Sequence, residues 1–230
     1  MELKPIAHIK TDFPTKFGVP RQSGLVKGLK GRIVFEKEYR DPEALRGLEC
    51  FSHIWLLWDF SEARREDCKW QPTVRPPRLG GNRRMGVFAT RSPFRPNNIG
   101  LSSVRIIGID LHTSDGPVIE VEGVDLMDGT PIFDIKPYLP FTDSHPDALA
   151  GFTETTFDNH ISTVRFSDEL LSAFDTEHIE VLREVLLSDP RPHYHDDAER
   201  IYAMEFAGKE VKFRVKEDTI EVWLECAKTE

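Results

Sequence analysis

The sequence predicts a mainly β protein, in which an N-terminal antiparallel β-barrel precedes a small α+β domain. Two observations support this prediction. Short runs rich in aromatic and β-branched residues recur through the first part of the chain, with tight-turn sequences between them. A clear helical pattern follows only after the composition shifts at residues 140–146. Because closing a sheet removes its exposed edges, short strands of this kind favour a barrel. We therefore expect domains at residues 1–145 and 146–230.

Four apolar runs predict the strands of the barrel. Residues 51–58 form a near-continuous aromatic and aliphatic run, which fits a strand buried on both faces. Further strands are expected at residues 104–111, 118–124 and 131–135. Turn sequences at residues 114–117 and 127–130 separate these last three strands.

The expected C-terminal domain contains one helix and a three-stranded meander. Apolar residues at helical spacing predict a helix over residues 176–187, with Thr176 as its N-cap and Pro190 and Pro192 beyond its end. Alternating apolar residues then predict strands at residues 202–206, 211–215 and 220–224. We expect this domain to pack on one face of a sheet.

The composition excludes several classes of protein. The three cysteines are widely spaced, which indicates reduced thiols in a cytoplasmic protein and no zinc site. No apolar run has the length of a membrane span, and the N-terminus lacks the pattern of a signal peptide. The phosphate-binding glycine motifs of doubly wound domains are also absent. His193 and His195 resemble metal ligands, but their spacing favours a solvated surface, so we expect no metal.

The charge of the chain is strongly segregated. The net charge is -9, yet no aspartate or glutamate occurs from Lys69 to Ile109. A basic segment in an acidic chain attracts phosphate without general stickiness, which favours a nucleic-acid partner. A solvated loop balanced by nearby carboxylates is the alternative. The basic segment contains Arg75, Arg78, Arg83, Arg84, Arg91, Arg95 and Arg105.

The most informative segment is Gly86–Ser102. It begins and ends with apolar residues that predict strands, and between them lie two arginines with several prolines and asparagines. A loop stiffened by proline that presents guanidinium and amide groups is suited to an anionic or planar polar ligand. The alternative is a rigid structural loop whose arginines bind carbonyl groups.

Three further clusters and one histidine are candidates for chemistry. Pro20-Arg21-Gln22 is a stiff polar loop, and Asp125-Leu126-Met127-Asp128 leads from a strand into a turn. Asp134, Lys136 and Tyr138 alternate, so they share one face of a strand and suit proton handling. His53 lies within an apolar run, where a core histidine is the simpler interpretation. Ordinary turns and an exposed sheet face are the alternatives for the three clusters.

Taken together, these segments resemble the TrmO family, also called the TsaA-like or YaeB family. The resemblance covers essentially the whole chain, since several long and unusual motifs occur in order. The motifs are Pro20-Arg21-Gln22, residues 46–53, residues 72–82, residues 86–102, residues 125–131, residues 134–140 and Asp189-Pro190-Arg191-Pro192.

The resemblance implies an S-adenosylmethionine-dependent tRNA methyltransferase built on a β-barrel. The implied reaction methylates N6 of N6-threonylcarbamoyladenosine, at position 37 beside the anticodon of threonine tRNA, and family members are homodimers. The resemblance and the residue types together assign three sets of groups. The methyl donor is expected to contact Pro20, Arg21, Gln22, His53, Arg91, Leu101, Asp125, Leu126, Met127 and Asp128. Proton handling is assigned to Asp134, assisted by Lys136 and Tyr138, and tRNA contacts to Arg75, Arg78, Arg83, Arg84, Arg95 and Arg191.

One position departs from the family pattern. The family usually has Pro-Asn-Pro-Ile-Gly, where this chain has Asn98 in place of the second proline. Losing a proline is expected to loosen the loop and to restore a donor amide. Two other functions remain open from the sequence: a non-catalytic RNA-binding β-barrel module, and a small-molecule methyltransferase on the same fold.

Overall fold

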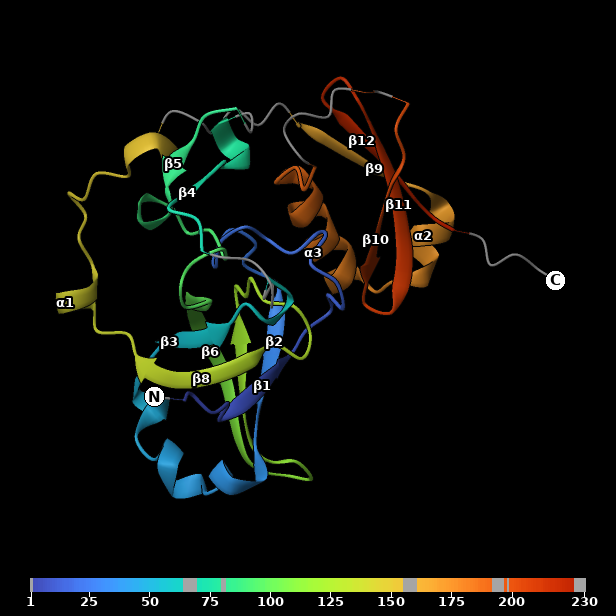
Figure 1. The fold of residues 1–230 in the computed structure, drawn as a ribbon. Helices are drawn as coiled ribbons and strands as arrows, with labels where there is room; N and C mark the ends of the chain where they lie inside the picture. The colour runs from blue at the N-terminus through green and yellow to red at the C-terminus, as the bar shows by residue number, and fades with distance from the viewer. Residues whose placement is uncertain are drawn as a thin grey trace.

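The computed structural model describes residues 2–63, 70–79, 82–154, 161–191, 197 and 199–225. Six antiparallel strands close into a barrel in the order β1-β2-β7-β6-β3-β8, which confirms the predicted mainly β fold (Figure 1). These strands are β1 (Ala7–Lys10), β2 (Lys30–Phe35), β3 (His53–Asp59), β6 (Ile99–Thr113), β7 (Gly116–Glu122) and β8 (Pro131–Pro137).

Alternation along β3 and β6 fixes which side chains face the inside of the barrel. Ile54, Leu56 and Trp58 of β3 are buried, whereas the residues between them are only half-buried. The prediction of a strand buried on both faces was therefore wrong, because the outer face of the wall is open here. On β6 the inner positions near its start are Gly100 and Ser102. Register pairs Ser102 with Leu56, and the next residue outward, Leu101, with Leu57.

A second, four-stranded sheet has the order β10-β11-β12-β9. It contains β9 (Thr163–Phe166), β10 (Tyr202–Phe206), β11 (Lys209–Lys216) and β12 (Thr219–Leu224), with β9 parallel to β12. Helices α2 (Asp168–Ala173) and α3 (Thr176–Leu187) accompany it. The N-cap of α3 is Asp175, whose side chain accepts the His178 N–H, so the prediction of Thr176 as N-cap was wrong by one residue.

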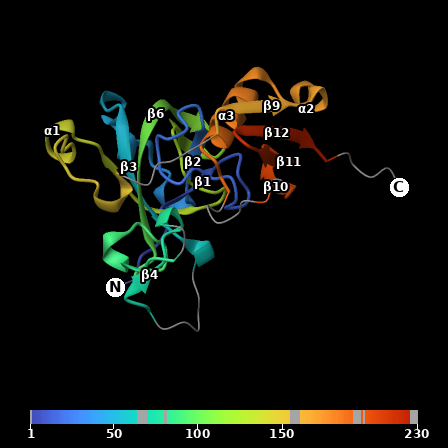
Figure 2. The ribbon, with the colours of Figure 1, turned by 90° about the horizontal axis from the view of Figure 1, so that it is seen from above.

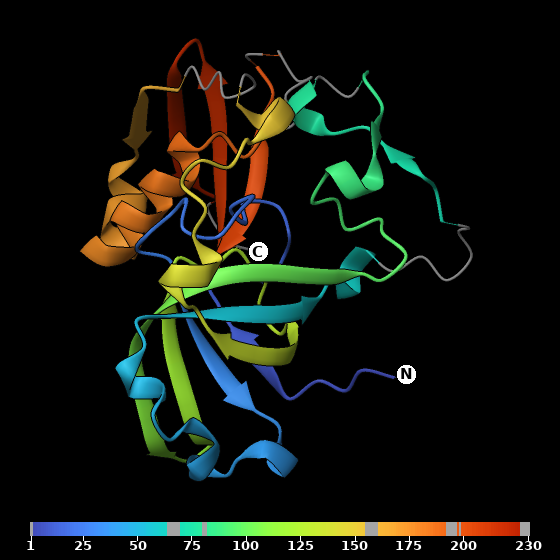
Figure 3. The same cartoon turned by 90° about the vertical axis from the view of Figure 1, so that its left-hand side faces the viewer.

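The barrel and the second sheet share one hydrophobic core. Phe13, in the connection between β1 and β2, is fully buried and its ring centroid lies 5.3 Å from that of Phe206 on β10. The Ala207 N–H donates to the Asp12 carbonyl at 2.9 Å. These contacts place the β1–β2 connection between the two units, and Figure 3 shows this loop below the second sheet.

A third, smaller unit lies between β3 and β6. It contains the two-stranded ribbon of β4 (Thr73–Val74) and β5 (Met85–Gly86), which projects away from the barrel (Figures 1 and 2). Residues 87–89, predicted as a strand, form the 3-10 turn η6 (Val87–Ala89) instead. The remaining short elements are η1 (Lys37–Tyr39), η2 (Pro42–Leu45), η3 (Leu48–Cys50), η4 (Ser61–Ala63), η5 (Pro77–Leu79), α1 (Pro140–Asp143) and η7 (Gly151–Thr153).

Candidate active site

The loop at residues 18–24, between β1 and β2, is shaped by two glycines. Gly18 has φ +97°, and a Cβ there would lie 2.8 Å from the Met204 sulfur of β10. Gly24 has φ +76°, and its N–H donates to the Gly123 carbonyl at 2.9 Å. Only glycine adopts such a conformation without strain. The loop is therefore fixed against both the second sheet and the end of β7.

This fixed loop brings Gln22 to Arg91. The Arg91 guanidinium donates to Gln22 Oε1, and Gln22 Nε2 donates to the Arg21 carbonyl. Arg91 follows η6, so two segments 69 residues apart in the sequence meet here. The structure thus brings together two of the residues that the sequence assigned to one ligand site.

Asp125 is the acidic group of the same cluster. Its Oδ1 accepts the Ser102 hydroxyl at 2.6 Å, and Ser102 Oγ accepts the Trp58 indole N–H at 2.9 Å. Burial raises the pKa of the Asp125 carboxyl to about 6, although the Ser102 hydrogen bond, backbone N–H groups including that of Ser23, and the charge of Arg91 oppose the shift. Asp125 is therefore a half-buried carboxylate held in a defined orientation next to a guanidinium.

Trp58 and Ser102 were not among the residues predicted from the sequence. Ser102 is buried on the inner face of β6, and the Trp58 ring lies against Gly100, where an added Cβ would come within 2.2 Å of the ring. A glycine and a serine at successive inward positions of a barrel strand are the sequence signal for this arrangement, because the interior normally takes larger apolar side chains.

A carboxylate and a guanidinium side by side can bind a zwitterion. Asp125 can accept hydrogen bonds from an ammonium group or from hydroxyls, and Arg91 can pair with a carboxylate. Gln22 adds both a donor and an acceptor, which suits the edge of a purine. Among the described residues, the buried side chains are apolar except for Asp59, Ser102 and Thr130, so packing of the barrel core does not account for this combination.

Of the other predicted donor contacts, Arg21, Asp128 and Met127 form hydrogen bonds within the chain. Arg21 donates to the carbonyls of Asp189 and Arg191, at 3.3 and 3.0 Å. The Asp128 carboxylate accepts the Thr11 N–H at 3.0 Å, which ties the turn after β7 to β1. The remaining predicted contacts are Pro20 and Leu126, which are buried, Met127, whose carbonyl accepts the Thr130 N–H and hydroxyl, and Leu101, whose side chain is exposed on the outer face of β6.

His53 lies apart from this cluster. It begins β3, whereas Trp58 stands five residues along the strand, a separation of about 16 Å. His53 Nδ1 is 2.9 Å from Ser52 Oγ, and its ring centroid is 6.2 Å from that of Tyr138. It is half-buried, so it is neither a core histidine nor a neighbour of Asp125 within this chain.

The three candidate catalytic groups lie on the outer face of the barrel wall. Lys136 Nζ is 2.8 Å from Asp134 Oδ2, and the Tyr138 ring centroid is 5.5 Å from that of Trp55. Asp134 pairs in register with Leu57, which pairs with Leu101. Ser102, the residue after Leu101, turns inward to Asp125. Asp134 and Asp125 therefore lie on opposite faces of the wall within one chain.

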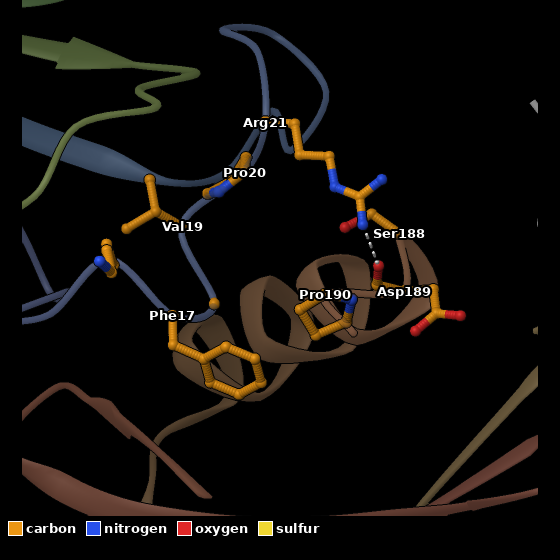
Figure 4. A pocket seen from close by; sticks show the side chains of 9 residues that line it. Phe17, Val19, Pro20, Arg21, Ser188, Asp189 and Pro190 are labelled. Carbon is orange, nitrogen blue, oxygen red and sulfur yellow. Dashed lines mark hydrogen bonds between the residues drawn. The ribbon is translucent and has the colours of Figure 1, made fainter. Parts of the chain in front are cut away.

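A small hollow of about 170 Å³ borders the Pro20-Arg21 segment (Figure 4). It lies between residues 16–21 and the Ser188-Asp189-Pro190 segment after α3. The dashed line in Figure 4 is the Arg21 hydrogen bond to Asp189. Pockets for cofactor-sized ligands are usually about 300 Å³ or larger. We therefore place the candidate ligand site at Gln22, Arg91 and Asp125, and interpret this hollow as part of the contact between the two domains.

The predicted RNA-contacting arginines divide into two groups. Arg75 and Arg83 are exposed, and Arg84 donates from Nε to the Thr73 hydroxyl at 2.9 Å, all on the β4–β5 unit. Arg95 donates to the Thr90 carbonyl at 2.8 Å. Arg191, by contrast, lies in the second domain and forms a two-point ion pair with Asp189. Nothing is described for the Arg78 side chain, although its backbone belongs to η5.

Asn98, the departure from the family pattern, closes its own loop. Its side-chain amide donates to the Pro93 carbonyl at 2.5 Å, and its carbonyl accepts the Phe60 N–H at 2.9 Å. A proline could not make the first contact. This side-chain contact thus restores part of the rigidity that the loop was expected to lose with the proline.

The part of the chain that the structure describes contains neither a cluster of metal ligands nor a membrane-spanning helix. No group of three or more His, Cys, Asp or Glu side chains there could hold a metal ion. Within the same ranges, no helix has the length and apolarity needed to cross a bilayer. His193 and His195 lie outside the described residues.

Comparison with known proteins gives the same result along the whole chain. Residues 8–144 match the profile of the tRNA-methyltransferase O N-terminal domain, and residues 160–226 match that of the TrmO C-terminal domain. A tRNA (adenine(37)-N6)-methyltransferase of Escherichia coli K12 is 41% identical over an alignment of 229 residues, and the match covers 96% of this chain and 96% of the other. A putative S-adenosylmethionine-dependent methyltransferase, RcsF of Pseudomonas aeruginosa, is 39% identical over 84% of this chain and 82% of its own length.

The fold is similar to that of solved structures as well. A crystal structure of TrmO from Pseudomonas aeruginosa has a TM-score of 0.75 and 32% identity, and the match covers 96% of this chain and 97% of the other. Both domain profiles, the relatives and the barrel agree with the resemblance seen in the motifs. The chain belongs to the TrmO family of tRNA methyltransferases.

Proposed function

We propose that this chain is a cytoplasmic enzyme that methylates N6 of N6-threonylcarbamoyladenosine 37 in threonine tRNA, with S-adenosylmethionine as the methyl donor. The observation that supports this proposal best is the meeting of Arg91, Gln22 and Asp125 at one end of the barrel. The name of the Escherichia coli relative supports the position and the atom, and that of the Pseudomonas relative supports the donor.

The chemistry of the cluster fits this donor. S-adenosylmethionine carries an ammonium, a carboxylate, a ribose and an adenine, and when bound it supplies an electrophilic methyl group on a sulfonium. Arg91 would pair with the carboxylate, and Asp125 would accept from the ammonium or the ribose hydroxyls. Gln22 would bind the adenine edge. Ser102 and Trp58 hold the Asp125 carboxylate in place, so it is oriented before the donor arrives.

The acceptor nitrogen requires help with its proton. It is ureido-like, so its lone pair is delocalised and removal of its N–H proton makes it a better nucleophile. Asp134 would accept this proton, and Lys136, 2.8 Å away, would orient its carboxylate. Tyr138, packed beside Trp55, would position the base. Alignment of the acceptor with the methyl group contributes much of the acceleration of such a displacement.

Because Asp134 and the donor cluster lie on opposite faces of the wall, we propose that the active enzyme is a homodimer in which each site uses both chains. The outer face of β6 supports this. Ile99, Leu101, Ile107 and Leu111 on this strand are all exposed apolar side chains, and their coverage by a second copy would be favourable.

The reaction is tested with labelled S-adenosylmethionine and tRNA from cells with and without the threonylcarbamoyl modification. We expect label only on modified threonine tRNA. If no RNA were labelled, and RNA binding depended on salt but not on the methyl donor, the protein would be a non-catalytic RNA-binding module. Turnover without any tRNA would identify a small-molecule methyltransferase.

The role of Asp134 is tested by single-turnover methyl transfer with Asp134→Asn. Near-wild-type rates of this variant at all pH values would show that Asp134 does not accept the proton.

The shared site is tested by subunit mixing. Arg91→Ala and Asp134→Asn chains carrying different tags are expressed together, and the mixed dimer is isolated. Each homodimer is expected to be inactive, whereas a mixed dimer keeps one intact site and up to about half the wild-type activity per dimer. An inactive mixed dimer would mean that both residues act in the same chain. A monomer in sedimentation would exclude the dimer itself.

A further inference from the structure

Two aromatic side chains on the β4–β5 unit are unusually exposed. Trp70 precedes β4 and is 48% exposed, and Phe88, in η6 after β5, is 71% exposed. Their ring centroids are 6.1 Å apart and the ring planes differ by 27°. Val87, beside Phe88, is buried, and its N–H donates to the Pro72 carbonyl at 2.9 Å. The two rings are thus held near each other by the ribbon, with apolar surface left in water.

The surroundings of these rings are basic. The Arg95 guanidinium carbon lies 6.0 Å from the centroid of Phe88, and its NH1 group is fixed by the Thr90 carbonyl at 2.8 Å. The sequence has no acidic residue from Lys69 to Ile109, a range that includes Arg75, Arg83 and Arg84 on the same unit. Exposed aromatic rings among arginines are the composition of surfaces that bind single-stranded nucleic acid.

We propose that Trp70, Phe88 and Arg95 form a stacking platform for unpaired bases of an RNA loop. The inference rests on the proposed tRNA methylation and extends it to the bases beside the target. Phe88 is three residues from Arg91, so their Cα atoms are at most about 11 Å apart. Bases stacked on the platform would therefore neighbour the nucleotide whose N6 is presented to the donor site.

The charge of this surface argues against a second copy of the chain as its occupant. A symmetric contact through the platform would place the arginines of one copy against those of the other, and like charges across an interface are unfavourable. An RNA loop provides both of the complementary features, phosphates for the arginines and base faces for the rings. Arg75 and Arg83 would meet phosphates, whereas the platform would meet bases.

The proposal is tested by binding measurements without methyl donor, so that it does not depend on catalysis. The probes are an RNA hairpin with an unpaired loop and a blunt RNA duplex with the same number of phosphates. Phe88→Ala and Trp70→Ala are expected to weaken hairpin binding roughly five- to 150-fold, the range of a lost base stack, with little effect on the duplex. Phe88→Tyr keeps a ring and is expected to bind as the wild type does.

Salt dependence separates stacking from charge. Phe88→Ala is expected to leave the slope of log K against log salt unchanged, whereas Arg75→Ala lowers it by about one and weakens both probes. Leu171→Ala is the matched control, because Leu171 is 45% exposed on α2, on the far side of the molecule from β4 (Figures 1 and 2). It is expected to change neither affinity.

Three results would overturn the platform. Equal losses on hairpin and duplex would reduce it to a charge effect, and unchanged hairpin binding by both alanine variants would exclude stacking. Dissociation of a dimer by Phe88→Ala in sedimentation would identify the surface as a contact between copies. If Phe88→Ala lost hairpin binding but the wild-type protein did not methylate tRNA, only the proposed reaction would be refuted, because the platform is tested by binding alone.

Discussion

At the scale of single residues, Asp125 sets the expected pH behaviour of the site. Its pKa is raised to about 6, so the carboxylate loses its charge as the pH falls through that value. An uncharged carboxyl pairs poorly with an ammonium group. We expect the KM for S-adenosylmethionine to rise roughly tenfold between pH 7 and pH 5, as follows from a single titration near 6. Steady-state kinetics over this range measure the effect.

The control for this prediction is Asp125→Asn, which keeps the Ser102 hydrogen bond because the amide oxygen still accepts it. Its KM is expected to be high and flat from pH 5 to pH 7. If the variant retained the wild-type pH dependence, another group would be titrating, and the result would show that Asp125 does not bind the donor.

The same shift predicts a cost in stability. The carboxyl of Asp125 has a higher pKa in the folded chain than its ordinary value of 3.8, so the folded state binds more protons between pH 4 and 6. The free energy of unfolding should therefore fall as the pH rises through this window. Asp125→Asn is expected to stabilise the protein at pH 7.5 by on the order of 2 kcal/mol, and not at pH 4. Urea unfolding at the two pH values checks this.

The sequence predicted the polar members of the candidate site but not the residues that hold them in place. Arg91, Gln22 and Asp125 are polar groups on loops, and such residues stand out in an otherwise apolar pattern. Trp58 and Ser102 occupy strand positions where a tryptophan and a serine have ordinary interpretations. Only the register of β3 against β6 brings them together. The proposed platform was not predicted from the sequence, because the charges of its segment were considered without Trp70 and Phe88.

At the scale of elements, the strands with strong alternation were predictable and the short ones were not. Residues 202–206 were predicted with their correct bounds, and α3 with its correct range. Strands β1 and β9 have four residues each, too few for a clear period, and they depend on partners distant in sequence. The apolar residues Val87–Ala89 predict a strand. The strand β5 ends at Gly86, however, and the next three residues form the 3-10 turn η6.

The packing of β3 against β6 gives a prediction at this scale. Gly100 lies under the Trp58 ring, and a Cβ would come within 2.2 Å of it. Gly100→Ala must displace Trp58 and with it the Ser102 and Asp125 contacts. We expect a loss of about 1–3 kcal/mol in unfolding free energy, the usual cost of overpacking, and a higher KM for the donor. Urea unfolding and kinetics measure the two effects.

Gly86→Ala is the matched control for this change. A Cβ at Gly86 meets nothing within 4 Å, and its φ of -57° suits any residue. It is expected to alter the unfolding free energy by less than about 0.5 kcal/mol. Equal stability of the two alanine variants would show that Trp58 moves aside without cost, and would separate the barrel packing from the donor site.

At the scale of the whole molecule, the β1–β2 connection joins the parts of the protein. It carries Phe13 into the common core, Arg21 to the segment after α3, and Gln22 to Arg91. A change in the C-terminal domain can thus reach the proposed donor site through one loop. The distance is short, because Arg21 and Gln22 are adjacent in the sequence.

Arg21 therefore gives a prediction about coupling between the domains. Its guanidinium donates to the carbonyls of Asp189 and Arg191, and a lysine lacks the planar fork that spans two acceptors. Arg21→Lys is expected to lower the hydrogen-exchange protection of residues 18–24 about tenfold in the free protein, and to raise the KM for the donor severalfold with little change in kcat. Arg40→Lys is the control, since Arg40 also donates to a backbone carbonyl, that of Phe35, at the other end of β2. Unchanged protection of the loop with a raised KM would mean that Arg21 contacts the donor directly, and that the two domains do not communicate through this residue.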